Sequence, residues 1–191
     1  VSNFLGGPDS YWNDLKGNIV IKLVSVFNIF SLGDYYINSL FFNFIIFFGH
    51  VMLYRLFIKI YPGSQVWVIM GCFLLPSTLY FSSGIHKDGL VLLLMAVVIY
   101  GVYQSLSKNR ISIKRLLFIL AGLILLFLVR NFIFLALLPA LFAWILAAKT
   151  KWNTALVFIS VYLFGGLAFF NINAVITKIN PPDIIVKKQE A

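Results

Sequence analysis

Apolar residues fill this chain in long runs that few charged residues interrupt. Dividing the sequence at its charges leaves runs near residues 36–58, 66–84, 89–106, 112–129, 131–148 and 153–173. Each is close to the roughly 20 apolar residues that an α-helix needs to cross a bilayer. The stretches 116–129 and 131–148 are apolar on every side of a helix, which suits lipid rather than one face of a soluble core. The pattern predicts an all-α, polytopic transmembrane helix bundle of about six spans.

The segment before the first span has a different pattern. Polar side chains recur every three or four residues between positions 18 and 31, and apolar side chains fill the opposite side. The polar positions are Asn18, Lys22, Ser25, Asn28 and Ser31. This periodicity indicates either an amphipathic interfacial helix lying on the membrane surface or a connecting helix packed on the bundle. We therefore divide the chain into an outer-face loop with this helix over 1–35 and a transmembrane bundle over 36–175.

Two boundaries are weaker than the rest. Only Arg130 and Asn131 join the fourth and fifth runs, so these runs could also form a tight helical hairpin or one kinked helix with an embedded arginine. After the sixth run, Asn-Pro-Pro-Asp at 180–183 ends helical structure, and 176–191 is interpreted as an outer-face tail, either solvated or the start of a truncated loop. The chain begins at Val1 without a Met, which suggests a piece of a longer protein with earlier spans missing.

Composition agrees with a membrane protein. Hydrophobic residues make up 61% of the 191 residues and charged residues 11%, against about 25% charged residues in a typical soluble domain. The net charge of +9 comes from basic residues in short loops between apolar runs, where they orient the protein in the membrane, so no nucleic acid is expected as a partner. The single cysteine, Cys72, lies in an apolar run and provides neither a disulfide framework nor a metal-ligand cluster.

The basic residues predict an orientation. If residues 1–35 lie outside, the inner loops contain Arg55, Lys59, Lys108, Arg110, Lys114, Arg115, Lys149 and Lys151. The short outer loops then contain only Lys87 and Arg130, as the excess of basic residues on the inner side requires. All six acidic residues fall on the outer side: Asp9, Asp14, Asp34, Asp88, Asp183 and Glu190. We expect a bacterial inner-membrane protein with residues 1–35 on the periplasmic or outer side.

The densest polar cluster lies between the second and third runs, at residues 82–89 after Pro76-Ser77. In the predicted topology Lys87 and Arg130 share one membrane level, and a lysine charge with an arginine fork suits a phosphate at the headgroup boundary. His86 and Ser83 belong to the same cluster. Asp88 would begin the third helix, where a carboxylate offsets the helix dipole, so the cluster can also be an ordinary helix cap with a polar loop.

A second candidate lies in Gly-Gly-Pro-Asp-Ser-Tyr-Trp-Asn-Asp at 6–14. Asp9 or Asp14 could act as a general base. Asp9 could also help to bind a divalent cation as a cofactor. Either residue could instead bond its own backbone in a turn, which the spacing favours. His50, inside the first run, is interpreted as bonding a neighbouring helix rather than as catalytic.

The stretch Leu75 to Leu90, reading LPSTLYFSSGIHKDGL and followed by an apolar run with Tyr100, resembles bacterial GT-C type membrane glycosyltransferases and related uncharacterised membrane proteins of Bacteroidetes. Leu-Val-Arg-Asn-Phe at 128–132 is similar to an arginine-containing junction of those proteins, although Asn131 stands where a proline often follows the arginine. The resemblance covers about residues 36–148 and rests on short motifs.

The resemblance implies a reaction. A polyprenyl-phosphate sugar would be the donor, and the sugar would pass to a glycan, lipid or protein acceptor on the outer face, in the synthesis of cell-envelope polysaccharide. It implies that Lys87 and Arg130, with His86, hold the donor phosphate, and that Asp9 or Asp14 deprotonates the acceptor, with Ser83 and Asp88 in support. Two alternatives stay open: a polysaccharide polymerase or flippase-like protein, and a non-enzymatic membrane subunit or transporter.

Overall fold

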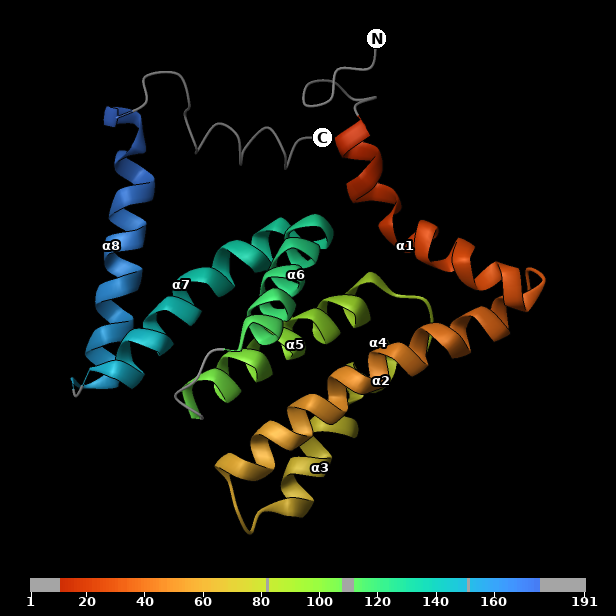
Figure 1. Ribbon diagram of the computed structural model, residues 1–191, viewed down its shortest axis with the longest axis horizontal. Coiled ribbons are helices and arrows are strands. Elements are labelled where there is room, and N and C mark those ends of the chain that lie inside the picture. Colours follow the sequence, from red (N-terminus) through yellow and green to blue (C-terminus); the bar gives the residue numbers. More distant parts are fainter. Residues whose placement is uncertain (1–10, 82, 108–111, 151, 176–191) are drawn as a thin grey trace. The chain divides into compact units, whose positions relative to one another are not determined.

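The computed structural model describes residues 11–81, 83–107, 112–150 and 152–175, with the backbone alone for 11–17, 81 and 168–175 (Figure 1). Every regular element within these ranges is an α-helix, so the all-α prediction is confirmed. The chain divides into two compact units, 1–134 and 135–191, which we describe separately. The predicted tail over 176–191 and the first ten residues lie outside the described ranges.

The first unit contains α1 (Tyr11–Ser31), α2 (Tyr35–Ile60), α3 (Gln65–Phe73), α4 (Pro76–Phe81), α5 (Lys87–Ser107) and α6 (Ile113–Val129). α7 (Asn131–Lys149) begins at the end of this unit and continues in the second, which also contains α8 (Thr154–Val175). Among the described residues, α2, α5 and α7 are long and apolar enough to cross a membrane. They coincide with three of the predicted runs, 36–58, 89–106 and 131–148.

The remaining predicted spans are not established by helix length. α6 has 17 residues, about 25 Å at 1.5 Å per residue, which is shorter than the roughly 30 Å hydrocarbon layer. The part of α8 whose side chains are described, Thr154–Leu167, is apolar but shorter still. The described part of the chain is therefore all-helical, with three candidate membrane spans.

The predicted span over 66–84 is not one continuous helix. Its residues form α3, with 9 residues, and α4, with 6, separated at Leu74 and Leu75. Pro76 explains the break, since its ring disfavours helical backbone at the preceding residue and it lacks the N–H that would continue the helix. Pro76 instead takes the first position of α4, where no intrahelical donor is needed.

The polar side of α1 packs against α2. Ser31 is 3% exposed and donates its hydroxyl to Asn38 Oδ1 at 2.7 Å, and the Asn38 amide donates to Asn28 Oδ1. α1 also contacts α6. On its other sides α1 exposes large apolar side chains, with Ile29 73% and Phe30 74% exposed. The observed packing matches the interpretation of a connecting helix on the bundle, whereas a place on the membrane surface stays a prediction.

The helices α2, α5 and α6 form the centre of the first unit, and glycines allow their close approach. A methyl group on Gly49 of α2 would lie 2.7 Å from Leu93 Cα of α5. One on Gly101 of α5 would lie 2.7 Å from Ile119 Cγ1 of α6. Small residues at such positions let helix backbones meet closely, as is common between membrane helices.

These contacts also fix the helix directions. Gly49 and Leu93 both lie in the interior of helices whose starts are close, because the Tyr35 hydroxyl at the start of α2 lies near Gly84, just before α5. α2 and α5 are therefore parallel. α6 returns alongside α5, since Gly122 packs against Val98 and the end of α6 reaches Asp88 through Arg130. In Figure 1 the green α5 and the blue-green α6 lie side by side.

Arg130 separates α6 from α7. It follows Val129 as the C-cap of α6, with an extended backbone (φ −148°, ψ 92°), and its N–H donates to Leu126 O at 2.8 Å. The Phe127 and Phe134 rings lie 5.2 Å apart across this junction, whereas residues seven apart in a straight helix are about 10 Å apart along the axis. The junction is a sharp turn between two helices, and the alternative of one kinked helix is wrong.

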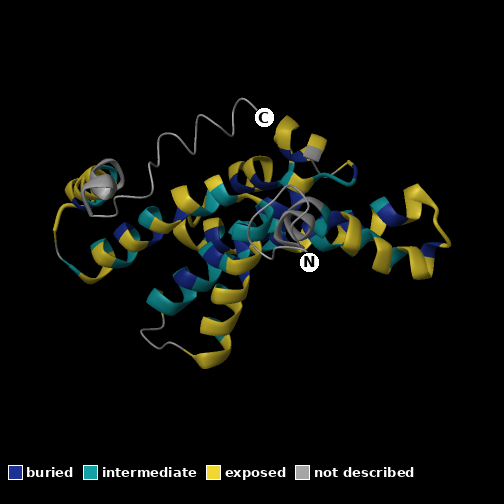
Figure 2. Cartoon of the chain, turned by 90° about the horizontal axis from the view of Figure 1, so that it is seen from above, coloured by how far each residue is buried: buried dark blue, intermediate teal, exposed yellow. Residues whose placement is uncertain are grey.

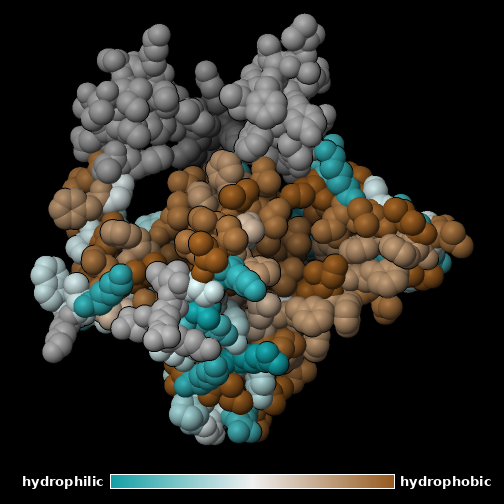
Figure 3. Space-filling view, in the orientation of Figure 1, coloured by the Kyte–Doolittle hydropathy of each residue, from teal (hydrophilic) through white to brown (hydrophobic). Residues whose placement is uncertain are grey.

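Many large apolar side chains are exposed, among them Phe44, Phe118 and Phe164 at 61%, 70% and 75%. Figure 2 shows exposed residues along much of the helix surface, and Figure 3 shows hydrophobic residues over most of the described face. Contiguous apolar surface of this extent is unusual for a soluble monomer and is typical of helices that face lipid.

Candidate polar site at one end of the first unit

The loop between α4 and α5 folds on its own hydrogen bonds. Ser83 Oγ donates to Tyr80 O at 2.7 Å, and the His86 N–H donates to Gly84 O at 3.1 Å. The His86 ring stacks on the Tyr80 ring at 5.4 Å between centroids. Gly84 is buried, and a methyl group there would lie 3.4 Å from both the Tyr35 hydroxyl and His86 Nε2. These contacts hold the imidazole at the start of α5.

An ion pair joins this loop to the end of α6. Arg130 donates from Nη2 to Asp88 Oδ1 at 2.8 Å, and the two side chains are 48% and 39% exposed. Asp88 lies in the first turn of α5, as the sequence predicted, where a carboxylate also favours the helix dipole. Lys87 precedes it with an exposed side chain. The structure thus brings Ser83, His86, Lys87 and Asp88 together with Arg130, although these segments are 42 residues apart at the ion pair.

The arrangement can hold an anion without losing the ion pair. A guanidinium has five N–H donors, and the bond to Asp88 uses one terminal nitrogen of Arg130. Lys87 and His86 precede Asp88 directly in the chain, so this end has two basic side chains, Lys87 and Arg130, beside one partly exposed carboxylate. A lipid-linked phosphate group is a suitable partner in both charge and geometry.

The other acidic candidates have a different outcome. Asp9 lies outside the described residues. Asp14 lies in α1, which begins at Tyr11, so its backbone is helical rather than in a turn. The Asp14 side chain is outside the described part of the structure. Asp34 caps α2 by accepting from the Tyr36 and Ile37 N–H groups at 2.8 and 3.2 Å. Within the described part of the chain no group of three or more His, Cys, Asp or Glu residues could hold a metal ion.

The hydrogen bond that the structure records for His50 lies within its own helix, α2. Its Nδ1 lies 3.2 Å from Ile46 O of the same helix, and its Nε2 is buried without a hydrogen-bond partner among the described residues. The sequence interpretation of His50 as an interhelical bond is therefore wrong. Asn43, which the sequence interpretation did not include, lines the same pocket as His50. Its buried Oδ1 also has no hydrogen-bond partner among the described residues. The signal that could have found it is its spacing of seven residues from His50, which places both on one side of α2.

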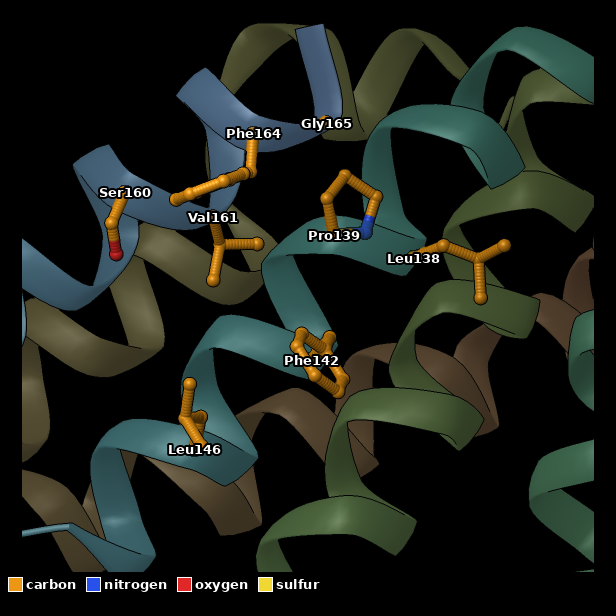
Figure 4. A pocket seen from close by; sticks show the side chains of 8 residues that line it. All are labelled: Leu138, Pro139, Phe142, Leu146, Ser160, Val161, Phe164 and Gly165. Carbon is orange, nitrogen blue, oxygen red and sulfur yellow. The ribbon is translucent and has the colours of Figure 1, made fainter. Parts of the chain in front are cut away.

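The second unit contains an apolar groove between α7 and α8, with a volume of about 720 Å³. Figure 4 shows Leu138, Pro139 and Phe142 of α7 opposite Val161 and Phe164 of α8. Its one hydroxyl, that of Ser160, donates to Val157 O at 2.9 Å. The Tyr162 hydroxyl donates to Ala136 O at 3.1 Å, which ties the two helices together. The groove has room for apolar groups but no side chain suited to acid–base chemistry.

Comparisons with protein-family models, curated proteins and solved structures found no match for this chain. The resemblance to GT-C glycosyltransferases therefore stays a prediction, and the function is argued from the site itself.

Proposed function

We propose that this protein is an integral membrane protein that binds a lipid-linked phosphate at the end of the first unit where α5 begins and α6 ends. Its ligand would be a polyprenyl-phosphate sugar, and it would transfer the sugar to a glycan, lipid or protein acceptor on the outer face of a bacterial inner membrane. The observation that carries the proposal is the contact of Arg130 with the 83–88 loop through Asp88.

Two physical features support a phosphate at this place. The site lies at the helix ends rather than along apolar helix faces, which is where a lipid phosphate would be if α5 crosses the bilayer. Basic side chains there can satisfy the phosphate oxygens, and charge-assisted hydrogen bonds are roughly twice as strong as neutral ones. Cations placed at the leaving phosphate would also stabilise the charge that develops as the sugar departs.

The proposed transfer also requires a catalytic base. Asp34 is engaged in capping α2, and Asp88 is paired with Arg130. Asp9 or Asp14 stays the candidate that the resemblance implies, with Asp9 as the possible site of a divalent cation. A carboxylate near the acceptor hydroxyl would accept its proton as the oxygen attacks the sugar carbon.

The binding step can be tested directly in the detergent-solubilised protein. Because each lost charge-assisted contact should cost about 1.5–3 kcal/mol, Lys87→Ala and Arg130→Ala should each weaken binding of a polyprenyl-phosphate lipid by roughly 10- to 150-fold. Arg115→Ala is a matched control, since Arg115 lies at the other end of α5 and α6 and donates to Gln104 O. Binding that is equally weak in all three variants, or unchanged in the first two, would refute the phosphate site.

The flippase-like alternative has one observation in its favour. α3 and α4 form a broken helical segment between two parallel helices, next to buried polar groups of α2. Irregular backbone at membrane depth is tolerated where it lines a cavity, and transporters place binding sites at broken helices. A protein that binds the lipid phosphate but transfers no sugar would favour this function over a transferase.

A further inference from the structure

A polar pocket lies halfway along α2, where α3 gives way to α4. It has a volume of about 260 Å³ and is lined by Asn43, Phe47, His50, Phe73, Thr78 and Leu79. Asn43 and His50 follow the start of α2 by 8 and 15 residues, or roughly 12 and 22 Å along the helix. If α2 spans a bilayer, both lie within the hydrocarbon layer. Polar residues there are costly and mark functional sites by default.

The hydrogen-bonding state of His50 decides what can bind. A carbonyl oxygen only accepts, so the contact of Nδ1 with Ile46 O at 3.2 Å places the hydrogen on Nδ1. Nε2 of the neutral ring is then an acceptor, and it is buried without a partner on a side chain that is 4% exposed. No charged residue lines the pocket.

The second buried group is also an acceptor. Asn43 Oδ1 is inaccessible to solvent and has no hydrogen-bond partner among the described residues. Seven residues separate it from His50, which puts both residues on one side of α2, with their Cα atoms about 10 Å apart along the axis and both side chains lining the same pocket. Two buried acceptors without donors cost free energy until a ligand supplies the donors.

We infer that this pocket is a binding site for an elongated neutral molecule with two hydroxyl groups, which donate to Asn43 Oδ1 and His50 Nε2. An anion is disfavoured because the two buried atoms without partners are both acceptors and no basic side chain except His50 lines the pocket, and an ammonium is disfavoured because no carboxylate lines it. The Phe47 and Phe73 rings, 5.8 Å apart, provide apolar walls for the carbon skeleton. Phe73 also stacks on the His50 ring at 6.0 Å, which keeps the imidazole in place. The inference does not depend on the phosphate site.

The test uses the two histidines of the chain as probes. In the full-length protein, labelled with ¹⁵N-histidine and embedded in lipid nanodiscs, NMR reports the His50 Nε2 signal, which His86→Gln identifies by removing the other. We expect a saturable shift of this signal with hexanediol carrying a hydroxyl at each end, and at least tenfold weaker binding of hexanol, which has one hydroxyl. Hexanediol should also bind about tenfold more weakly to Asn43→Leu, because one hydroxyl is then left unpaired.

Ser39→Ala, one turn before Asn43, should leave the titration unchanged, because the exposed Ser39 hydroxyl donates to Tyr36 O outside the pocket. The comparison of the two alcohols in the unaltered protein holds even if Asn43→Leu fails to fold. Equal binding of both alcohols would overturn the inference, as would a hydrogen on Nε2. A signal that responds to D₂O and to neither alcohol would show that water alone fills the pocket, which also overturns it.

Discussion

At the scale of single residues, the Arg130–Asp88 pair sets the charge of the proposed phosphate site. The pair is worth little to stability, because surface ion pairs with side chains this exposed contribute about 0–1 kcal/mol. Its effect on an anionic ligand is larger, since the Asp88 carboxylate partly cancels the cations around it. The pair therefore tunes binding more than it holds α5 and α6 together.

Asp88→Asn should strengthen phosphate binding. A unit charge about 6 Å from the phosphate contributes roughly 0.7 kcal/mol at the dielectric constant of water and more near a protein surface, so we expect a gain of about three- to tenfold. Titration of the polyprenyl-phosphate lipid at low and high salt measures it, and the gain should shrink as salt screens the charges. Weaker binding would show instead that Asp88 orients Arg130 for the ligand.

The candidate site was partly visible in the sequence. Lys87 and Arg130 were expected at one membrane level because the apolar runs alternate in direction, and the structure places their segments together. The pairing of Arg130 with Asp88 depends on how far α6 returns along α5, which no local pattern encodes. Asn43 Oδ1 and His50 Nε2 are buried without partners because of how α3 and α4 pack beside α2, and the apolar run over 66–84 gives no sign of this packing.

At the scale of helices, the close contact of α2 and α5 rests on a glycine. Gly49→Ala should destabilise the protein by about 1–3 kcal/mol, because the added methyl group would meet the backbone of Leu93 rather than a movable side chain. Gly71→Ala in α3 is the matched control, since nothing lies within 4 Å of a methyl group there. That change should be neutral or stabilising through the better helix propensity of alanine.

Denaturation of both variants in detergent, followed by far-ultraviolet circular dichroism, measures the difference. Equal stability of Gly49→Ala and the unaltered protein would mean that α2 and α5 do not approach as closely as described.

Helix bounds followed local signals closely, whereas helix continuity did not. α2 begins after the Asp34 cap, and α5 begins at the charged Lys87-Asp88 pair, so their starts lie within two residues of the predicted runs. The 66–84 run is long and largely apolar, and hydropathy alone could not reveal its break at Leu74 and Leu75. Pro76 indicates the break, because a proline disfavours helical backbone at the preceding residue, whereas the length of the run indicates a single span.

At the scale of the whole molecule, parallel α2 and α5 require a return crossing between them. If both helices span the bilayer, the chain from Ile60 to Lys87 has to come back through the same thickness, and α3 and α4 are the segments available. Such a crossing places the break between α3 and α4 within lipid, where the Leu74 N–H still donates to Met70 O and Leu75 O accepts from the Leu79 N–H, both at 3.0 Å. Irregular backbone at membrane depth is tolerated where it lies beside protein or a polar cavity, and the pocket of Asn43 and His50 adjoins the break through Phe73 and Thr78.

This topology makes a prediction about which loops face which side of the membrane. In a Cys72→Ala background, which lacks the single native cysteine, we expect Ser83→Cys to react with a membrane-impermeant maleimide in spheroplasts. Ser112→Cys and Thr150→Cys should react only after permeabilisation, because α5 and α7 cross from the Ser83 side and the basic residues near 108–115 and 149–151 stay inside. The reverse pattern would contradict the orientation, and labelling of Ser83→Cys and Ser112→Cys from the same side would mean that α5 does not cross. In either case the phosphate site would lose its place at the outer face, while the contact of Arg130 with Asp88 would stand.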